Sequence, residues 1–183
     1  MSTEKNLYLT GYRGTGKSTV GQRLAERLQT QCIDLDDVVE AVAGKSIREI
    51  FEQGGEESFR DFESSALVEV SSQDGVVISL GGGAILRPEN RKRISSRGFC
   101  FWLDAQPETI LKRLRGDASS EQRRPALTDL NELEEIRAML TSRQKFYSEV
   151  SSYRINVTDR GIGGITEEIL LRWQELKDSG AEG

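Results

Sequence analysis

The eight residues at positions 11–18 constrain this chain more than any other part of its sequence. They read Gly-Tyr-Arg-Gly-Thr-Gly-Lys-Ser and fit the pattern G-x-x-x-x-G-K-[ST] in full. An apolar run at 7–10 precedes them, and apolar residues at helical spacing follow from Lys17. A strand, a glycine-rich turn and a helix in this order aim successive backbone N–H groups at a phosphate. The segment therefore predicts a site for a nucleotide's phosphates.

Each part of this segment has an expected role. Lys17 is predicted to reach the β- and γ-phosphates of ATP, and the Ser18 hydroxyl to bind Mg²⁺. The expected nucleotide contacts are Gly14, Thr15, Gly16, Lys17, Ser18 and Thr19. The alternative is an ordinary glycine-rich turn between a strand and a helix. The motif also leaves the acceptor open, because either water or a metabolite hydroxyl can receive the phosphoryl group.

The remaining sequence alternates between short apolar runs and amphipathic segments. We predict five strands, at 7–10, 32–35, 76–80, 99–103 and 153–157. We predict helices from 17, from 36, and at 46–51, 59–70, 88–97, 107–115, 133–146 and 165–176. Such alternation is typical of an α/β fold with a parallel sheet covered by helices on both faces. We expect one domain over residues 1–183, with a polar surface loop at 116–130 and a frayed tail at 178–183.

The composition excludes several classes of function. The chain has 25 Lys and Arg against 30 Asp and Glu, and the net charge of −5 argues against nucleic acid as a partner. No histidine is present, which excludes Ser-His-Asp hydrolysis and histidine-bound zinc. Cys32 and Cys100 each fall on an expected strand, so we predict two free thiols and a cytoplasmic protein. No window approaches the roughly 18 apolar residues of a membrane span, so we expect no membrane partner.

A second group of residues lies at expected strand ends and on expected helices. Asp34 and Asp36 follow the second strand, where alternation along the strand would aim both acids to one side. Three consecutive glycines at 81–83 follow the third strand, and a ligand pressed against bare backbone would explain them. Arg60 and Arg143 lie on helices. The alternatives without a ligand are helix-start charges for the acids, a flexible turn for the glycines, and solvated surface charges for the arginines.

Taken together, these residues resemble the shikimate kinase family. The elements that carry the resemblance run from about Leu7 to about Arg160. They are the phosphate loop, Asp34-x-Asp36, Gly44-x-Ser46-Ile47-x-x-Ile50-Phe51, Gly55-Glu56-x-x-Phe59-Arg60-x-x-Glu63, Gly81-Gly82-Gly83, Arg124-Pro125 and Arg143-x-x-x-Tyr147. The resemblance implies a three-layer α/β/α P-loop fold with a five-stranded parallel sheet in the order 2-3-1-4-5, a lid and substrate-binding helices.

The resemblance also implies roles for individual residues. Shikimate is expected to contact Asp36, Arg60, Gly81, Gly82, Gly83 and Arg143. Asp34 is expected to hold Mg²⁺ with Ser18, and Arg124 to meet the phosphates from the lid. Lys17, Asp36 and Arg124 are the expected catalytic residues. Arg113, Arg115 and Arg160 are candidates for contact with adenine, with Arg160 preferred.

The resemblance implies transfer of the γ-phosphoryl group of ATP to the 3-hydroxyl of shikimate by a monomer. Three alternatives remain open. The chain could be a related kinase for gluconate or a nucleoside monophosphate, a nucleotide-binding regulator, or a non-catalytic member of the fold. Paired arginines suit a carboxylate and favour shikimate over a nucleotide acceptor.

Overall fold

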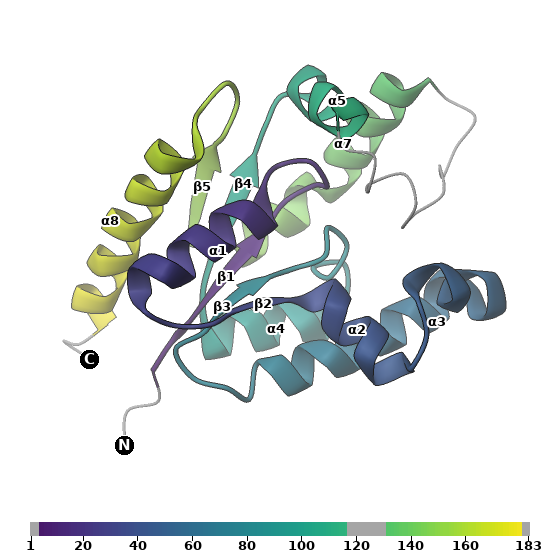
Figure 1. Ribbon diagram of the computed structural model, residues 1–183, viewed down its shortest axis with the longest axis horizontal. Coiled ribbons are helices and arrows are strands. Elements are labelled where there is room, and N and C mark those ends of the chain that lie inside the picture. The colour runs from purple at the N-terminus through teal and green to yellow at the C-terminus, as the bar shows by residue number, and fades with distance from the viewer. Residues whose placement is uncertain (1–3, 117–130, 181–183) are drawn as a thin grey trace.

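The computed structural model describes residues 4–116 and 131–180, and its centre is a parallel β-sheet (Figure 1). The five strands lie in the order β2-β3-β1-β4-β5, which confirms the predicted fold class. They are β1 (Asn6–Thr10), β2 (Cys32–Asp34), β3 (Val77–Ser79), β4 (Gly98–Asp104) and β5 (Tyr153–Asn156). All four neighbouring pairs are parallel, so the carboxyl ends of the strands meet along one edge.

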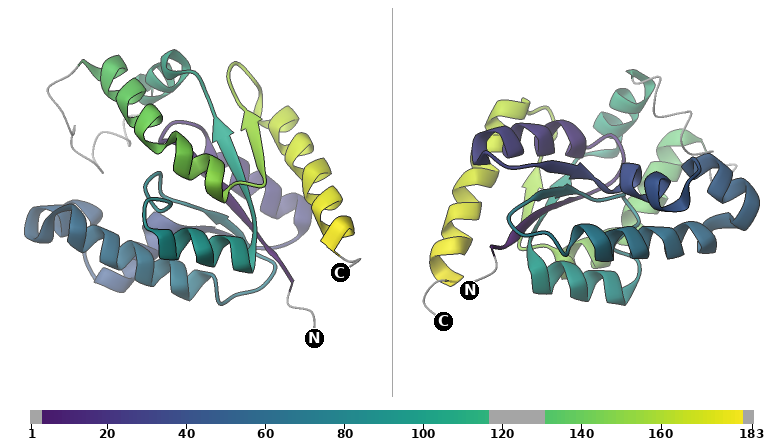
Figure 2. Two further views of the ribbon diagram at one scale, coloured as in Figure 1. Left: turned by 180° about the vertical axis from the view of Figure 1, so that it is seen from behind. Right: turned by 60° about the horizontal axis from the view of Figure 1, so that its bottom comes forward.

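Helices connect the strands and cover both faces of the sheet. They are α1 (Lys17–Leu28), α2 (Leu35–Ala43), α3 (Ile47–Val70), α4 (Pro88–Arg97), α5 (Pro107–Gly116), α7 (Glu132–Val150) and α8 (Ile162–Gly180). The ribbon seen from the front and from behind shows α1 and α8 on one face, with α4 and α7 on the other (Figures 1 and 2). The three-layer arrangement follows, as predicted from the alternation of strands and helices.

The strand β4 shows how one strand supplies two cores. Its side chains alternate between the faces, so that Cys100 and Trp102 join the core under α3, α4 and α7. Phe101 and Leu103 join the core under α1 and α8. Because both faces are covered, the strand is apolar at almost every position, which is why it was easy to recognise in the sequence.

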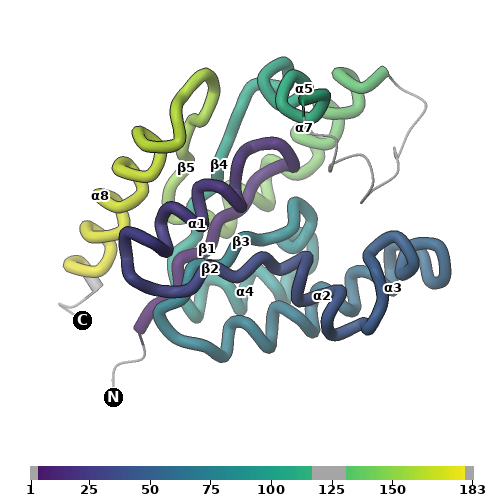
Figure 3. Tube along the Cα trace, viewed as in Figure 1, coloured from purple at the N-terminus to yellow at the C-terminus, as the bar shows by residue number. Residues whose placement is uncertain are grey.

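Two local signals shape the helix α3. Ser46 and Glu49 form a reciprocal capping box, and their bonds fix the start of α3. Gly55 interrupts this helix with a non-helical conformation (φ 68°), which favours glycine. The two helices predicted from the sequence are therefore two parts of α3 joined at a kink. Figure 3 shows α2 and the first part of α3 projecting beyond the sheet.

Several boundaries differ from expectation or lie outside the described residues. The strand β2 ends at Asp34 and not at residue 35, because the Asp34 side chain already accepts a hydrogen bond from the backbone N–H of Asp36 at the start of α2. The helix α8 continues to Gly180, and the Ser179 hydroxyl donates to the Glu175 and Leu176 carbonyl oxygens one turn back. Most of the expected lid (117–130) and the last residues of the expected tail (181–183) lie outside the described residues. Among the described helices, none has both the length and the apolar character to cross a membrane.

Candidate active site

The phosphate loop joins β1 to α1 in the geometry that the motif predicts. Gly11 has a φ of 140°, and a Cβ at this position would lie 2.3 Å from the Leu103 carbonyl oxygen, so no other residue fits. Gly16 is the N-cap of α1 and provides no side chain to cap the helix. The first N–H groups of α1 therefore point toward the loop, together with the positive end of the helix dipole.

Lys17 lies across this loop. Its Nζ atom donates to the carbonyl oxygens of Gly11 at 2.8 Å and Tyr12 at 2.9 Å. The buried Thr15 hydroxyl donates to the same Tyr12 oxygen at 2.7 Å. These bonds hold the loop in a closed curve with the ammonium group at its mouth, where the β- and γ-phosphates of a nucleotide would lie.

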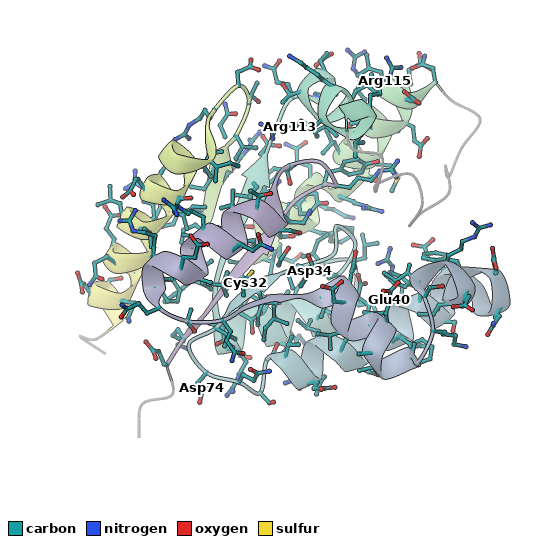
Figure 4. The ribbon with its side chains drawn as sticks, in the orientation of Figure 1. Cys32, Asp34, Glu40, Asp74, Arg113 and Arg115 are labelled. Atoms are coloured by element: carbon teal, nitrogen blue, oxygen red, sulfur yellow. The ribbon has the colours of Figure 1, made fainter. Side chains whose placement is uncertain are left out.

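Ser18 and Asp34 form a pair beside the loop. The Ser18 hydroxyl donates to Asp34 Oδ2 at 2.8 Å, while Asp34 Oδ1 caps α2 through the Asp36 N–H. Figure 4 shows Asp34 at the end of β2. Burial raises the pKa of the Asp34 carboxyl, and the charges of Asp36 and Asp37 raise it further, against the lowering effect of the Ser18 bond. A cation bound here would relieve this concentration of negative charge.

The pair fits the requirements of Mg²⁺. This ion takes oxygen ligands, keeps several waters and binds one or two carboxylates together with substrate phosphates. Within residues 4–116 and 131–180, no group of three or more acidic, histidine or cysteine side chains could form a protein cage for a metal. Ser18 and Asp34 would thus supply the protein's part of a site completed by nucleotide phosphates and water.

Asp36 lies on a different element from the one predicted. Strand alternation does not aim Asp34 and Asp36 to one side, because β2 ends at Asp34 and Asp36 stands in the first turn of α2. The cap formed by Asp34 holds that turn against the strand end. The two acids are still close enough for the charge of Asp36 to raise the pKa of Asp34.

Arg60 is a buried cation, and the alternative of a solvated surface charge is wrong. Its side chain is 8% exposed and donates to Glu63 Oε2 at 2.6 Å and Glu56 Oε1 at 3.1 Å. Burial alone lowers the pKa of the Arg60 guanidinium, but the carboxylates of Glu63 and Glu56 outweigh this effect and raise it. The Glu63 side chain is fully buried. Since Glu63 stands one helical turn after Arg60, it holds the guanidinium from within the same helix.

Arg143 is buried as well and reaches the same place from α7. Its Nη1 atom donates to the Gly82 carbonyl oxygen at 3.2 Å, and the Tyr147 hydroxyl donates to that oxygen at 2.8 Å. A Cβ on Gly82 would lie 3.6 Å from Arg143 Nη1, and one on Gly83 would lie 2.4 Å from Arg60 Nη2. Both guanidinium groups therefore lie against the triglycine turn.

The triglycine turn also touches the phosphate loop. A Cβ on Gly82 would lie 3.3 Å from the Gly11 oxygen and 3.7 Å from the Tyr12 Cα. The Gly81 carbonyl oxygen accepts from the N–H of Ala84, which tightens the turn that follows β3. The structure thus brings the predicted substrate residues and the predicted phosphate loop to one edge of the sheet, the usual place for ligands in parallel α/β proteins.

The predicted adenine contacts are distributed differently. Arg160 is held by Glu168 at 2.5 Å and by the carbonyl oxygens of Asn156 and Gly164, at the start of α8. Arg115 pairs with Glu132 on the surface. Arg113 is closer to the phosphate loop, because its guanidinium lies 3.5 Å from the Gly14 and Thr15 carbonyl oxygens (Figure 4). Thr19 is exposed in the first turn of α1, and Arg124 lies outside the described residues.

Three residues gained their importance from the structure. Glu63 holds Arg60, Tyr147 holds the triglycine turn, and Arg113 braces the phosphate loop from α5. The spacing of Arg60 to Glu63 and of Arg143 to Tyr147 could have indicated the first two, because residues three or four apart share a helix face. Arg113 was expected only as a candidate for adenine, and its contact with the phosphate loop had no comparable signal.

Comparison with known proteins decides the family. Residues 13–174 match the family model described as shikimate kinase. The chain belongs to the shikimate kinase family. A shikimate kinase of Rhodopirellula baltica is 47% identical over 91% of this chain and 89% of its own length. One of Symbiobacterium thermophilum is 40% identical over 96% of this chain and 99% of its own.

Solved structures agree with the family. A shikimate kinase from Acinetobacter baumannii in complex with shikimate has a TM-score of 0.86 and 35% identity, covering 96% of both chains. A gluconokinase from Sinorhizobium meliloti reaches a TM-score of 0.65 over 98% of this chain and 97% of its own, but with 15% identity. That second likeness shows the shared fold alone, whereas the first extends to the sequence.

Proposed function

We propose that this shikimate kinase family member transfers the γ-phosphoryl group of ATP to the 3-hydroxyl of shikimate, giving shikimate 3-phosphate and ADP. One observation carries the proposal. Two buried arginines, Arg60 and Arg143, lie against a glycine turn that itself touches the phosphate loop. Forked guanidinium donors bind a planar carboxylate well, and shikimate carries a carboxylate and hydroxyls on one ring.

The residues divide into an acceptor side and a nucleotide side. Arg60 and Arg143 hold the shikimate carboxylate, and the backbone of residues 81–83 lets the ring approach closely. Asp36 accepts a hydrogen bond from the attacking hydroxyl and orients it. On the nucleotide side, the N–H groups of residues 14–19 bind the phosphates. Arg160 is proposed to contact adenine. Arg113 is proposed to share this contact, because it lies nearer to the phosphate loop.

Transfer proceeds in line. The acceptor oxygen forms a bond to the γ-phosphorus, the bond to the β–γ bridging oxygen breaks, and the hydroxyl proton leaves toward Asp36. Lys17 and Arg124 stabilise the charge of the transferring group. Ser18 and Asp34 would hold Mg²⁺, which would supply further charge neutralisation at the phosphates. Positioning and electrostatics of this kind account for most of the acceleration in phosphoryl transfer.

Some properties of the whole protein belong to the same proposal. The chain is proposed to act as one domain and as a monomer. A reducing cytoplasm suits its two free thiols. In this compartment the reaction would supply the pathway to chorismate and the aromatic amino acids.

Acceptor-stimulated release of ADP tests the function. The purified chain is assayed with Mg²⁺·ATP and, in parallel, shikimate, gluconate, a nucleoside monophosphate or no acceptor. We expect turnover with shikimate well above the other three reactions. Turnover with a different acceptor and none with shikimate would overturn the substrate, and equal release without acceptor would indicate a nucleotide hydrolase.

Two variants test the division of roles. Lys17→Met should largely abolish transfer, because the loop loses its cation. Arg143→Ala should raise the KM for shikimate at least about tenfold while leaving ATP binding intact. Arg137→Ala is the matched control, since Arg137 stands on the same helix but pairs with Glu108 at the surface. Unchanged shikimate kinetics in Arg143→Ala would remove it from the site.

A further inference from the structure

Arg13 is a cation within the phosphate loop that the motif itself does not require. The motif fixes the first, sixth, seventh and eighth positions of residues 11–18, and Arg13 stands third. On its amino-terminal side, the Tyr12 Cα lies close to the triglycine turn, 3.7 Å from where a Gly82 Cβ would be. On its carboxyl-terminal side, a Cβ on Gly14 would lie 3.2 Å from the Leu114 side chain of α5. The Arg13 backbone therefore stands between the acceptor side and the nucleotide side.

The Arg13 side chain also differs from the other cations of the site in its contacts. Lys17 bonds to loop carbonyls, Arg60 to two carboxylates and Arg143 to the Gly82 carbonyl. Arg13 is half-buried, and its Cζ atom lies 5.9 Å from the centroid of the Tyr12 ring. Across residues 4–116 and 131–180, no hydrogen bond or ion pair joins this guanidinium to another side chain or to the backbone.

The Arg13 guanidinium has five N–H donors and is half-buried. Because its contact among the described residues is the Tyr12 ring, these donors are available for an anion. The contact with Tyr12 is weak compared with charge-assisted hydrogen bonds to phosphate oxygens. An anion that arrives between the acceptor side and the nucleotide side is the transferring phosphoryl group, because the acceptor attacks it from one side and ADP leaves on the other. Its negative charge is spread over three equatorial oxygens during transfer.

We infer that Arg13 is a further catalytic residue, whose guanidinium leaves the Tyr12 ring and donates hydrogen bonds to the equatorial oxygens of the γ-phosphoryl group as it is transferred. The inference rests on the proposed function. Arg13 keeps its proton throughout, while the bond to the acceptor oxygen forms and the bond to the bridging oxygen breaks. Its contribution is larger in the transition state than in the ground state, since the contact strengthens as charge develops on those oxygens.

Three variants separate this role from a structural one. Arg13→Met keeps much of the length and removes the charge, and Arg13→Lys keeps the charge without the fork. Arg23→Met is the matched control, because Arg23 lies on α1 and pairs with Glu26 in solvent. We expect Arg13→Met to lower kcat by about 10- to 100-fold with less than about threefold change in either KM. Arg13→Lys should recover part of the loss, and Arg23→Met should match the wild type.

A binding measurement keeps the test independent of the acceptor. Aluminium fluoride with Mg²⁺·ADP mimics the transferring group, so calorimetry can compare its affinity with that of Mg²⁺·ADP alone. Arg13→Met should weaken the fluoride complex about tenfold or more and leave ADP binding unchanged. The inference is overturned if kcat and fluoride affinity both stay at wild-type values, or if the effect falls on the KM for ATP or shikimate instead. Wild-type inactivity toward shikimate would refute the proposed substrate, and the fluoride result would still decide the role of Arg13.

Discussion

The candidate site keeps charged side chains buried at a cost to stability. Arg60 and Glu63 are both removed from water, and buried ion pairs seldom stabilise a fold relative to apolar residues of the same size. The pair lies where a carboxylated substrate is expected, and this placement gives it a functional reason. Glu63 also leaves the guanidinium with a fixed direction, so little side-chain entropy remains to be lost when a ligand binds.

Gly83→Ala tests whether Arg60 must lie in this place. The new Cβ would lie 2.4–2.6 Å from the Nη and Cζ atoms of Arg60, so the guanidinium must move. We expect the KM for shikimate to rise at least about tenfold, with the KM for ATP unchanged. Gly163→Ala is the control, because nothing lies within 4 Å of a Cβ there. Unchanged steady-state kinetics in Gly83→Ala would show that Arg60 does not hold the substrate.

Asp34 illustrates how function and stability oppose each other at one residue. Burial raises the pKa of its carboxyl in the folded state above the value in the unfolded chain. The folded state therefore binds this proton more tightly, and stability is lost as pH rises through the raised pKa. When it is ionised, the carboxylate lies near the charges of Asp36 and Asp37, a penalty that a bound cation would offset.

Asp34→Asn removes this penalty and keeps the helix cap, because an amide oxygen also accepts from the Asp36 N–H. We expect the melting temperature at neutral pH, without Mg²⁺, to equal or exceed that of the wild type. We also expect kcat to fall on the order of 100-fold and the stabilisation by Mg²⁺·ADP to shrink. Thermal melts with and without Mg²⁺ measure both. A variant that melts lower and retains full Mg²⁺ dependence would contradict this account.

At the scale of elements, α7 (Glu132–Val150) ties the substrate side of the cleft to the core. Asn131 caps its start, and Arg143 and Tyr147 stand one turn apart on its buried face. The ring of Tyr147 stacks on Trp102 of β4 with centroids 5.4 Å apart, while its hydroxyl holds the Gly82 carbonyl. The helix thus sets the distance between the sheet and the triglycine turn.

Tyr147→Phe keeps the stack and removes the bond to Gly82. We expect the KM for shikimate to rise about three- to tenfold and the free energy of unfolding to fall by about 1 kcal/mol. The KM for ATP should not change, because the phosphate loop keeps its own bonds. Tyr153→Phe is the control, since its hydroxyl reaches Glu175 at the surface at 3.4 Å. Equal effects on both substrates would mean that Tyr147 supports the fold and does not position the turn.

At the scale of the whole molecule, the fold could be predicted because its signals are local. Each strand is a short apolar run, whereas each helix repeats its apolar residues every three or four positions, so the two kinds of element have clearly different periods. The break at Gly55 was visible as a pair of glycines. The helix end at Gly180 is not predictable in this way, because residues 177–180 are polar or small and continue no apolar repeat.

The site was less predictable, since it depends on contacts between distant segments. The loop at 11–18 carries its chemistry in one stretch of sequence, so spacing sufficed. The convergence of Arg60 and Arg143 on residues 82 and 83 required the resemblance to the family, because a lone helical arginine is usually solvated. The bracing of the loop by Arg113 joins residues about 100 positions apart, and nothing local indicates it.

The two thiols report on the stability of the whole molecule. Burial raises the pKa of Cys100 to about 12 and that of Cys32 to about 11, and Cys100 is 1% exposed beneath the helices on one face. In a Cys32→Ser variant, a thiol reagent at pH 8 should label Cys100 only after the core opens.

Because ligands that bind the folded state lower the open fraction, ADP with shikimate at about 100 times their dissociation constants should slow labelling about 100-fold or more. Mass spectrometry over time measures the rate. Labelling as fast as in urea, or a rate that ligands leave unchanged although calorimetry shows them bound, would mean that Cys100 becomes exposed without opening of the site.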